Sequence, residues 1–375
     1  MSWVSASELK VTVISTFGGT AGGAEQWLAS VLAHSRGLRV RAIILEAGPL
    51  ADVLAAQGAE ILVLPTGSSA RDMANTARLL LADLRAHRPE VIVANGVKAM
   101  AAVAGPAVAL GIPRVWVKHD HSFDASLARP LGRIATKVIA TALEVGMPTC
   151  RKDLVVIEPE RPADPESRSS ALAALAQLGY TATDQPTCAI IGRLVPYKGV
   201  DVGIASLAYD PARRWRLVVI GAASPATPDE LERLTALAAD LGVIDRVDFL
   251  GSIPGAGRLV SAFDALAVLT RPGQPNAPDR EGYGITATEA MLGGIPVVIA
   301  GPGPVARRLQ TPAGPAGIMV AQADPYAVAE ALATLTDPDS RLKMGQAGRN
   351  AALLQPDAQQ VADEFVGVLR TASRR

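Results

Sequence analysis

The chain has 375 residues, with 36 basic and 36 acidic side chains, so its formal net charge is zero and no basic excess points to nucleic acid as a partner. Hydrophobic residues make up 49% and charged residues 19%, which excludes a disordered chain and is enough for large buried cores. The length therefore predicts two domains.

The location predicted from the sequence is the cytoplasm. Residues 1–5 lack the basic and apolar pattern of a secretory signal, and the apolar stretch 99–113 is too short to span a bilayer. Cys150 and Cys188 lie far apart and have no neighbouring histidine cluster. This spacing disfavours both a disulfide framework and a zinc site, and it suits a reducing compartment.

The first half of the chain alternates apolar strands with Ala-rich helical sequence. Such continuous strands predict a parallel sheet that is covered by helices on both faces. The predicted strands are at 10–15, 40–45, 61–64, 91–94, 114–117, 138–140 and 154–157.

A glycine-rich turn joins the first predicted strand to the first helix. Gly18, Gly19 and Gly23 would bring backbone N–H groups and a helix N-terminus close to an anion, so they are candidate ligand-binding residues. Because position 20 is Thr, the spacing is not G-x-G-x-x-G, which disfavours a nicotinamide site. Glu46 follows the second strand, where a ribose-binding acid lies in nicotinamide enzymes, and this keeps that alternative open.

His119 follows the predicted strand at 114–117 and is a candidate catalytic residue. It forms a His-Asp-His sequence with Asp120 and His121, which could suit a metal, but no third ligand cluster is visible and no metal is predicted. Between residues 97 and 152 there are eight Lys or Arg against three acidic residues. The excess predicts solvated helix faces, or else contact with an anionic acceptor or a phospholipid surface.

The second half repeats the strand and helix alternation after a segment rich in proline and charge. That segment predicts a linker. A final amphipathic helix over 357–369 has Val361, Phe365 and Val368 on one stripe. The predicted parts are a first domain at 1–160 with 357–375, a linker at 161–186 and a second domain at 187–356.

Two basic residues follow the strand that ends at Ile191. Gly192 frees the turn, and Arg193 and Lys198 lie at the carboxyl end of the strand, which is where open α/β sheets bind ligands. A diphosphate leaving group needs positive charge of this kind as its bond breaks.

Two carboxylates, Glu281 and Glu289, are eight positions apart. A helix from Gly284 to Leu292 would direct Glu289 to the groove that Glu281 approaches from the preceding loop. Gly284, after Tyr283, would let the backbone come close to a ligand there.

Together these motifs resemble the retaining glycosyltransferases of family 4, which have the GT-B fold. The matching elements are E-x7-E at Glu281, G-R-L-x-x-x-K-G at Gly192, Gly-Gly-Ala-Glu at Gly22 and the His-Asp at His119. The resemblance implies two Rossmann-like α/β domains facing across a cleft, with the C-terminal helix crossing back to the first domain. It also implies a nucleotide diphosphate sugar donor, a small-molecule or glycan hydroxyl acceptor, and no metal or other cofactor.

The resemblance also implies individual roles. Arg193 and Lys198 would hold the diphosphate of the donor. Glu281 would contact the donor sugar, with His119 beside it, and Glu289 would bind the ribose. Tyr283 and Gly284 are further candidates for donor binding.

Several alternatives stay open at this point. The same fold could serve a sugar-nucleotide epimerase or a phosphorylase, although no pyridoxal-binding lysine is identified. A non-catalytic sugar-nucleotide-binding partner is an alternative from another class, and a nicotinamide dehydrogenase is more distant. The sequence leaves the nucleobase, the sugar, the acceptor and the oligomeric state open.

Overall fold

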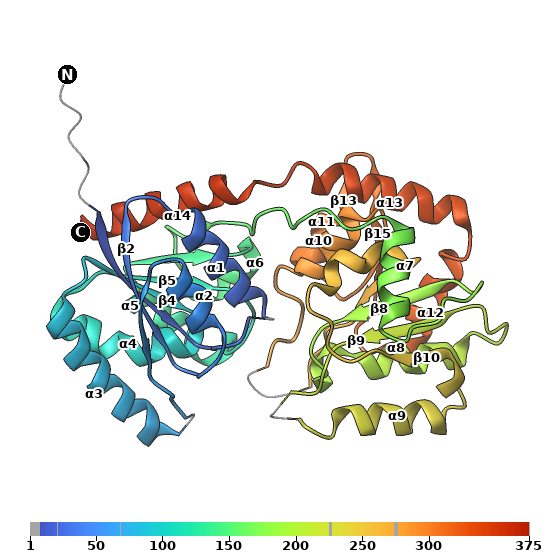
Figure 1. Cartoon of the computed structure of the whole chain (residues 1–375), viewed down its shortest axis with the longest axis horizontal. Helices are drawn as coiled ribbons and strands as arrows, with labels where there is room; N and C mark the ends of the chain where they lie inside the picture. Colours follow the sequence, from blue (N-terminus) through green and yellow to red (C-terminus); the bar gives the residue numbers. More distant parts are fainter. Residues whose placement is uncertain (1–7, 21, 68, 225–226, 274–276, 375) are drawn as a thin grey trace. The chain divides into compact units, whose positions relative to one another are not determined.

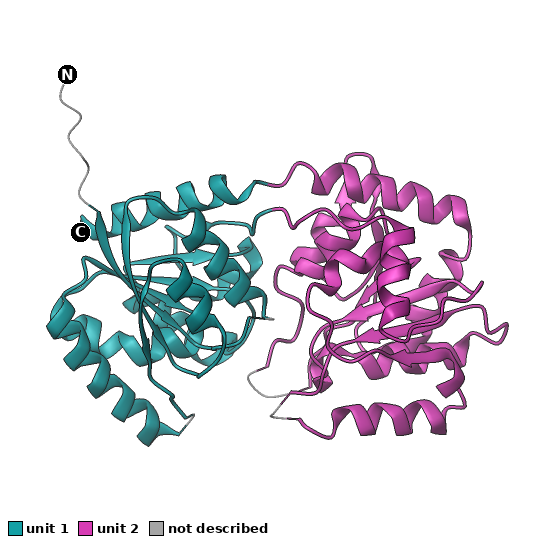
Figure 2. Ribbon diagram, in the orientation of Figure 1, with its two compact units in different colours: residues 1–160, 356–375 teal, residues 161–355 magenta. Residues whose placement is uncertain are grey.

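The chain forms two α/β units, each with its own parallel sheet. The computed structural model describes residues 8–20, 22–67, 69–224, 227–273 and 277–374, so residues 1–5 of the targeting argument and position 21 of the glycine-rich turn lie outside it. Unit 1 comprises residues 1–160 and 356–375, and unit 2 comprises residues 161–355 (Figure 2). Among the described residues, no helix has the length and apolar character needed to cross a membrane.

The sheet of unit 1 has seven parallel strands in the order β3-β2-β1-β4-β5-β6-β7. Each predicted strand of the first half is present, within a few residues of its expected ends. The strands are β1 (Leu9–Ser15), β2 (Leu38–Ile44), β3 (Glu60–Val63), β4 (Val91–Asn95), β5 (Arg114–Lys118), β6 (Lys137–Ala140) and β7 (Val155–Val156).

Helices pack on both faces of this sheet, as its continuous apolar strands predict. One face buries Trp27 of α1, and the other buries Leu84 of α3 and Met100 of α4. The helices of unit 1 are α1 (Gly23–His34), α2 (Leu50–Ala56), α3 (Ala70–His87), α4 (Val97–Leu110), α5 (Arg129–Ile134), α6 (Leu143–Gly146) and α14 (Ala358–Ser373), with a π-helical turn at Asp124–Ala128 (Figure 1).

The C-terminal helix α14 returns to unit 1, as the predicted fold class requires. Asp357 and Gln360 form a capping box at its start, which satisfies N–H groups that the first turn leaves free. Its stripe of Val361, Phe365 and Leu369 is buried, and the Phe365 ring meets the Trp27 ring edge to face at 5.6 Å between centroids.

The sheet of unit 2 has six parallel strands in the order β10-β9-β8-β11-β12-β15, beside a small antiparallel pair β13-β14. The edge strand β15 was not predicted, because its four residues include a glycine and carry no strong β pattern. The strands are β8 (Thr187–Ile191), β9 (Arg216–Ile220), β10 (Val247–Phe249), β11 (Ala265–Val268), β12 (Val297–Ala300), β13 (Gln310–Thr311), β14 (Gly314–Pro315) and β15 (Gly317–Val320).

The segment 161–186, expected as a linker, belongs to unit 2. Its helix α7 buries Ala171 and Leu175 in the core of that unit, which explains the difference. The helices of unit 2 are α7 (Arg168–Gln177), α8 (Val200–Ser206), α9 (Glu230–Asp240), α10 (Ile285–Leu292), α11 (Pro304–Arg308), α12 (Pro325–Thr334) and α13 (Pro338–Ala352), with a 3-10 helix at Ala256–Ala262.

Each sheet changes its direction of strand order at one point. In unit 1 this switch point lies between β1 and β4, and in unit 2 between β8 and β11. Loops leaving the carboxyl ends of the two strands on either side of a switch point diverge, so they leave a crevice in which ligands of open α/β sheets bind.

Candidate functional site

The loop after β8 carries Lys198 over the end of β11. A 3-10 turn at Pro196–Lys198 is followed by Gly199, whose backbone is left-handed with φ 69°. A side chain at Gly199 would place its Cβ 2.2 Å from the carbonyl oxygen of Leu269, so only glycine allows the loop to lie this close to β11. The loop therefore fixes Lys198 at the switch point of unit 2.

Lys198 forms an ion pair with Glu281. The Lys198 Nζ atom lies 2.7 Å from Glu281 Oε2, and Thr270 Oγ1 donates to the same oxygen at 2.9 Å. Burial alone would raise the pKa of Glu281, but the charge and hydrogen bond of Lys198, together with the hydrogen bonds of Thr270 and the Gly282 backbone, outweigh it, and the pKa is lowered. Burial conversely opposes the positive charge of Lys198, and Glu281 raises its pKa. Both groups are therefore charged at neutral pH.

Arg193, Lys198 and Glu281 line one pocket at the ends of β8 and β11. Arg193 is exposed, and within the described part of the chain its side chain donates to the Tyr197 hydroxyl alone, at 3.4 Å, which leaves most of its N–H groups to solvent. The structure thus brings together three of the predicted residues, two cations and one carboxylate, at the place where the fold binds ligands.

Gln322 holds the segment that leads from Thr270 to Glu281. Its Nε2 atom donates to the carbonyl oxygens of Thr270, at 3.2 Å, and Asp279, at 2.7 Å. Two bonds from one amide tie both ends of this segment to the loop that follows β15. Gln322 therefore positions Glu281 without touching it.

Glu289 lies on α10, against the 3-10 helix at Ala256–Ala262, and is absent from the lining of the Lys198 pocket. A Cβ atom on Gly257 would lie 1.9 Å from the Glu289 carboxyl group, so glycine makes room for it. Within the described residues no hydrogen bond or ion pair reaches this carboxylate, and burial raises its pKa to about 7. A half-buried acceptor without a donor favours a ligand that brings hydroxyl groups.

Tyr283 and Gly284 shape the start of α10. Gly284 has φ 73° at the N-cap, and a Cβ there would lie 2.6 Å from the Val305 side chain. The buried Tyr283 ring is covered by the Arg308 guanidinium, 3.8 Å from its centroid, and Arg308 also donates to Thr288 at 2.9 Å. These contacts give both residues a structural part in α10, and their role in donor binding stays a prediction.

In unit 1, His119 is held by two neighbours at the corresponding switch point. Its Nε2 atom lies 2.6 Å from Asn95 Oδ1, at the end of β4, and its ring meets Trp27 edge to face at 5.4 Å. Asn95 Nδ2 donates to the Ala24 carbonyl at 3.4 Å, which turns Oδ1 toward the histidine. Burial lowers the pKa of His119 to about 4, so the ring is neutral near pH 7.

The glycine-rich turn lies at the end of β1, beside Asn95 and Ala24. A Cβ on Gly18 would lie 2.1 Å from the Glu46 carbonyl oxygen, so this glycine is needed for packing. A Cβ on Gly19 would meet no atom within 4 Å, so packing does not require glycine there. Ligand binding by Gly18, Gly19 and Gly23 stays a prediction.

Much of the basic excess between residues 97 and 152 is used inside unit 1. The buried Lys118 pairs with Asp124 at 2.6 Å, and His121 Nδ1 lies 2.9 Å from the same carboxylate. Lys137 and Arg151 both pair with Asp153, at 3.0 and 2.8 Å. His121 is thus tied to Asp124, while contact of this region with a membrane or an anionic acceptor stays a prediction.

Sequence reasoning missed Thr270, Asn95, Gly257 and Gln322. Thr270 and Asn95 carry a usable signal, because each is a polar residue at the carboxyl end of a buried strand: Asn95 is the last residue of β4, and Thr270 lies two residues after β11. Gly257 and Gln322 carry none, since their importance comes from contacts with residues far along the chain.

The two parallel-sheet units, each with its switch point, define the GT-B fold of glycosyltransferases. The structure has a TM-score of 0.79 to that of Anabaena Alr3699/HepE in complex with UDP and glucose, at 23% identity, covering 97% of this chain and all of that one. It has a TM-score of 0.69 to WaaG, a glycosyltransferase involved in lipopolysaccharide biosynthesis, at 18% identity, covering 96% of this chain and 99% of that one.

Residues 180–351 match the family Glycosyl transferases group 1, which confirms the predicted resemblance over unit 2. The chain is 34% identical over 188 residues to D-inositol 3-phosphate glycosyltransferase of Acidothermus cellulolyticus, covering 48% of this chain and 40% of that one. It is 35% identical over 179 residues to a GDP-mannose-dependent alpha-(1-6)-phosphatidylinositol monomannoside mannosyltransferase of Mycobacterium tuberculosis, covering 45% of this chain and 43% of that one. The chain thus matches less than half the length of these curated relatives.

Proposed function

We propose that the protein is a retaining glycosyltransferase that moves a sugar from a nucleotide diphosphate sugar to a hydroxyl acceptor without a metal. The observation that carries this proposal is the Lys198–Glu281 pair at the switch point of unit 2, with Arg193 in the same pocket. Support also comes from the UDP and glucose named for the Anabaena structure and from the group 1 family match.

Each candidate site residue has a separate role in the proposed reaction. Arg193 and Lys198 stabilise the negative charge that develops on the diphosphate as the anomeric carbon–oxygen bond breaks. Glu281 binds the donor sugar, and Glu289 accepts hydrogen bonds from the ribose hydroxyls. The neutral His119 orients the sugar through a hydrogen bond, because its low pKa removes it as an acid near pH 7.

The configuration at the anomeric carbon is retained because the acceptor attacks this carbon from the same face that the diphosphate leaves. The acceptor oxygen forms the new bond to the anomeric carbon, and its proton passes to an oxygen of the departing diphosphate. The electron pair of the broken bond stays with that diphosphate. Glu281 does not serve as the nucleophile in this scheme, because its carboxylate already accepts hydrogen bonds from Lys198 and Thr270, which make it less nucleophilic.

A non-catalytic sugar-nucleotide-binding protein and an epimerase remain the alternatives. The first experiment is a thermal-shift screen of the full chain against UDP, GDP, ADP and TDP, since a ligand at 100 times its dissociation constant stabilises by about 2.7 kcal/mol. Incubation with sugar donors of the base that binds should then release nucleoside diphosphate, and an acceptor should increase the rate. Binding without release would support the non-catalytic alternative, and isomerised donor without release would support the epimerase.

A further inference from the structure

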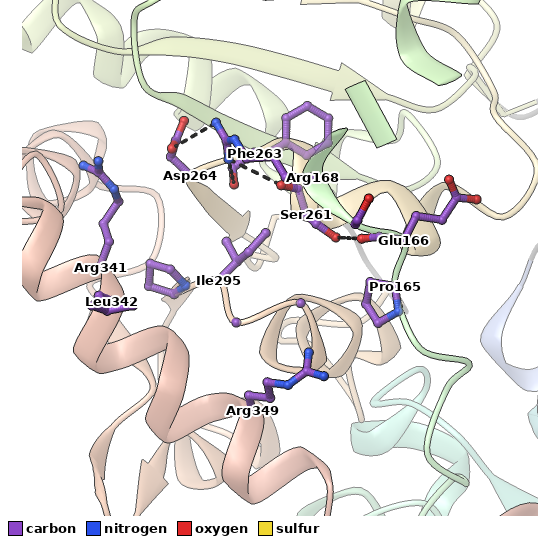
Figure 3. Close-up of a pocket in the computed structure, with 14 residues that line it drawn as sticks. Pro165, Glu166, Arg168, Ser261, Phe263, Asp264, Ile295, Arg341, Leu342 and Arg349 are labelled. Atoms are coloured by element: carbon purple, nitrogen blue, oxygen red, sulfur yellow. Dashed lines mark hydrogen bonds and ion pairs between the residues drawn. The ribbon is translucent and has the colours of Figure 1, made fainter. Parts of the chain in front are cut away.

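Charged side chains also gather away from the pocket at the ends of β8 and β11. One such place is a groove of unit 2, where Arg341 and Arg349 of α13 lie on one side of Ile295 and Arg168 of α7 lies on the other (Figure 3). Backbone carbonyls hold these arginines at different points and their guanidinium groups point apart, so they form no common site. Another place lies in unit 1 beside His119, and there the charged groups converge.

Lys118, the last residue of β5, has a fully buried side chain. Its ammonium group forms an ion pair with Asp124, with 2.6 Å between Nζ and Oδ1, and it also donates to the backbone carbonyl of Asp120. Removing an ammonium group from water costs free energy that a buried ion pair often only offsets, and an apolar side chain would avoid that cost. Stability alone therefore does not explain a lysine at this position.

The contacts of Lys118 fix the backbone on which His119 lies. Because Asp120 directly follows His119, the bond from the Lys118 side chain to the Asp120 carbonyl closes a ring of atoms that contains the His119 backbone. Asp120 is held further, since its Oδ1 atom accepts from the backbone N–H of Ser122 at 2.9 Å. Directly after the neighbouring strand β6, Thr141 donates its hydroxyl to the His119 carbonyl at 3.3 Å. Two successive carbonyl groups, those of His119 and Asp120, are thus held by side chains.

The carboxylate of Asp124 is itself held in place. Asp124 begins the π-helical turn, a kind of turn that occurs frequently at functional sites. Phe123 before it has a left-handed backbone with φ 57°, which is uncommon for a residue with a side chain, and its carbonyl accepts from three backbone N–H groups of the turn. His121 Nδ1 lies 2.9 Å from the second carboxylate oxygen of Asp124. The turn and His121 therefore fix the group that pairs with Lys118.

The ring of His119 needs a fixed backbone to keep its 2.6 Å contact with Asn95. A displacement of about 1 Å in an active site can lower a rate about a hundredfold. We propose that Lys118, Asp124 and Thr141 are positioning residues, which hold His119 in the place from which it orients the donor sugar. They act through the His119 backbone and not by contact with the substrate. This inference rests on the proposed function, because only that function gives His119 a sugar to orient.

The test removes these supports in the full chain. Lys118→Met with Asp124→Asn removes both charges together, so neither stays buried without its partner, and the new amide oxygen remains a hydrogen-bond acceptor. Thr141→Val replaces the hydroxyl by a methyl group, whereas Thr141→Ser keeps the hydroxyl. The matched control is Lys137→Met with Asp153→Asn, which removes an ion pair of 3.0 Å at the other end of β6 in the same unit.

Turnover and binding are measured separately. UDP-glucose and GDP-mannose are offered as donors, release of nucleoside diphosphate gives kcat and KM, and calorimetry gives the affinity for UDP and GDP. In the double variant and in Thr141→Val, kcat should fall about tenfold or more, while nucleoside diphosphate affinity stays unchanged because the predicted diphosphate site lies in unit 2. Thr141→Ser and the control should keep the wild-type kcat. A purely structural role would instead lower the melting temperature and leave the kcat of the folded protein unchanged.

The ring of His119 offers a second measurement that needs no ligand. NMR titration of 15N-labelled histidines, with His119 assigned by its loss in His119→Asn, reports the ring pKa, which burial holds at about 4. Thr141→Val changes no charge, so a ring that leaves its buried place should show a pKa that rises by about one unit or more.

Wild-type kcat in the double variant or in Thr141→Val, an equal loss in the control, or an unchanged His119 pKa in Thr141→Val would overturn the proposal. If the double variant does not fold, Thr141→Val decides in the same way. If the wild type releases no nucleoside diphosphate from either donor, that result counts against the proposed function. The His119 titration then judges the positioning by itself.

Discussion

Replacing Glu289 with glutamine should stabilise the free protein at high pH and weaken nucleotide binding. The carboxyl group lies half-buried against Gly257, and desolvation raises its pKa from 4.5 to about 7. Between these values the folded state keeps the proton that the unfolded state releases. The free energy of unfolding of the wild type is therefore highest below the pKa that Glu289 has in the unfolded state. It falls as the pH rises through the pKa that Glu289 has in the folded state.

The size of the effect follows from that shift. One pKa unit corresponds to about 1.4 kcal/mol, so the shift corresponds to roughly 3 kcal/mol, and partial exposure of the side chain reduces this to about 2 kcal/mol. Glutamine keeps the shape and carries no charge, so it avoids this loss. For a domain of this size, 2 kcal/mol corresponds to about 4–8 °C in melting temperature.

Scanning calorimetry of wild type and Glu289→Gln at about pH 5 and about pH 8 measures the difference. The variant should melt higher at the alkaline pH, and the gap should nearly close at the acidic pH. Gly257→Ala provides a matched perturbation, because its Cβ would strike the carboxyl group and destabilise unit 2 at either pH. A Glu289→Gln gap that is the same at both pH values would refute the reasoning.

Three further outcomes are expected. Lys198→Ala should weaken nucleoside diphosphate binding by about 1.5–3 kcal/mol and nucleoside binding much less; equal losses in calorimetric titrations would move Lys198 out of the phosphate site. Asn95→Ala leaves the buried His119 N–H without its acceptor, so the protein should lose about 1–3 kcal/mol of stability, and an unchanged denaturation midpoint would contradict that assignment. Removal of residues 357–375 exposes the core that Phe365 fills, and each buried apolar side chain contributes roughly 1.5–3 kcal/mol to the free energy of unfolding. The truncated protein should therefore aggregate or melt at a clearly lower temperature. Soluble protein with an unchanged melting temperature would be evidence against this packing.

The fold was predictable from the sequence because its signals are local. Apolar strands such as Val91–Asn95 stand out as β-branched runs between helical segments, and the last helix shows its stripe at Val361 and Phe365. The edge strand β15 was missed because Gly317 and Met319 interrupt its β pattern. The linker prediction failed at α7 because only the tertiary packing of Leu175 shows that this short helix belongs to unit 2.

The candidate site was predictable only in part. Lys198 and Glu281 lie in the loops that follow β8 and β11, two neighbouring parallel strands, so the topology places both loops at one edge of the sheet. The ion pair between the two side chains is seen only in the structure. Gln322 could not be expected, because its role depends on reaching the carbonyl groups of Thr270 and Asp279, far away in the sequence. The unpaired state of Glu289 could likewise not be expected, because it depends on which residues of the folded unit lie near its carboxylate, among them Gly257.

The measurement that tests the central claim most directly is nucleoside diphosphate release by the wild type and by Glu281→Gln, with sugar donor and acceptor present. Glutamine keeps the size of the side chain but loses the charge that pairs with Lys198. The affinity for free nucleoside diphosphate should stay nearly unchanged, while turnover should fall about a hundredfold or more, as for loss of an electrostatic contact in the transition state. Turnover at the wild-type rate would contradict the assignment of Glu281 to the donor sugar, and no release by the wild type would contradict the proposed activity.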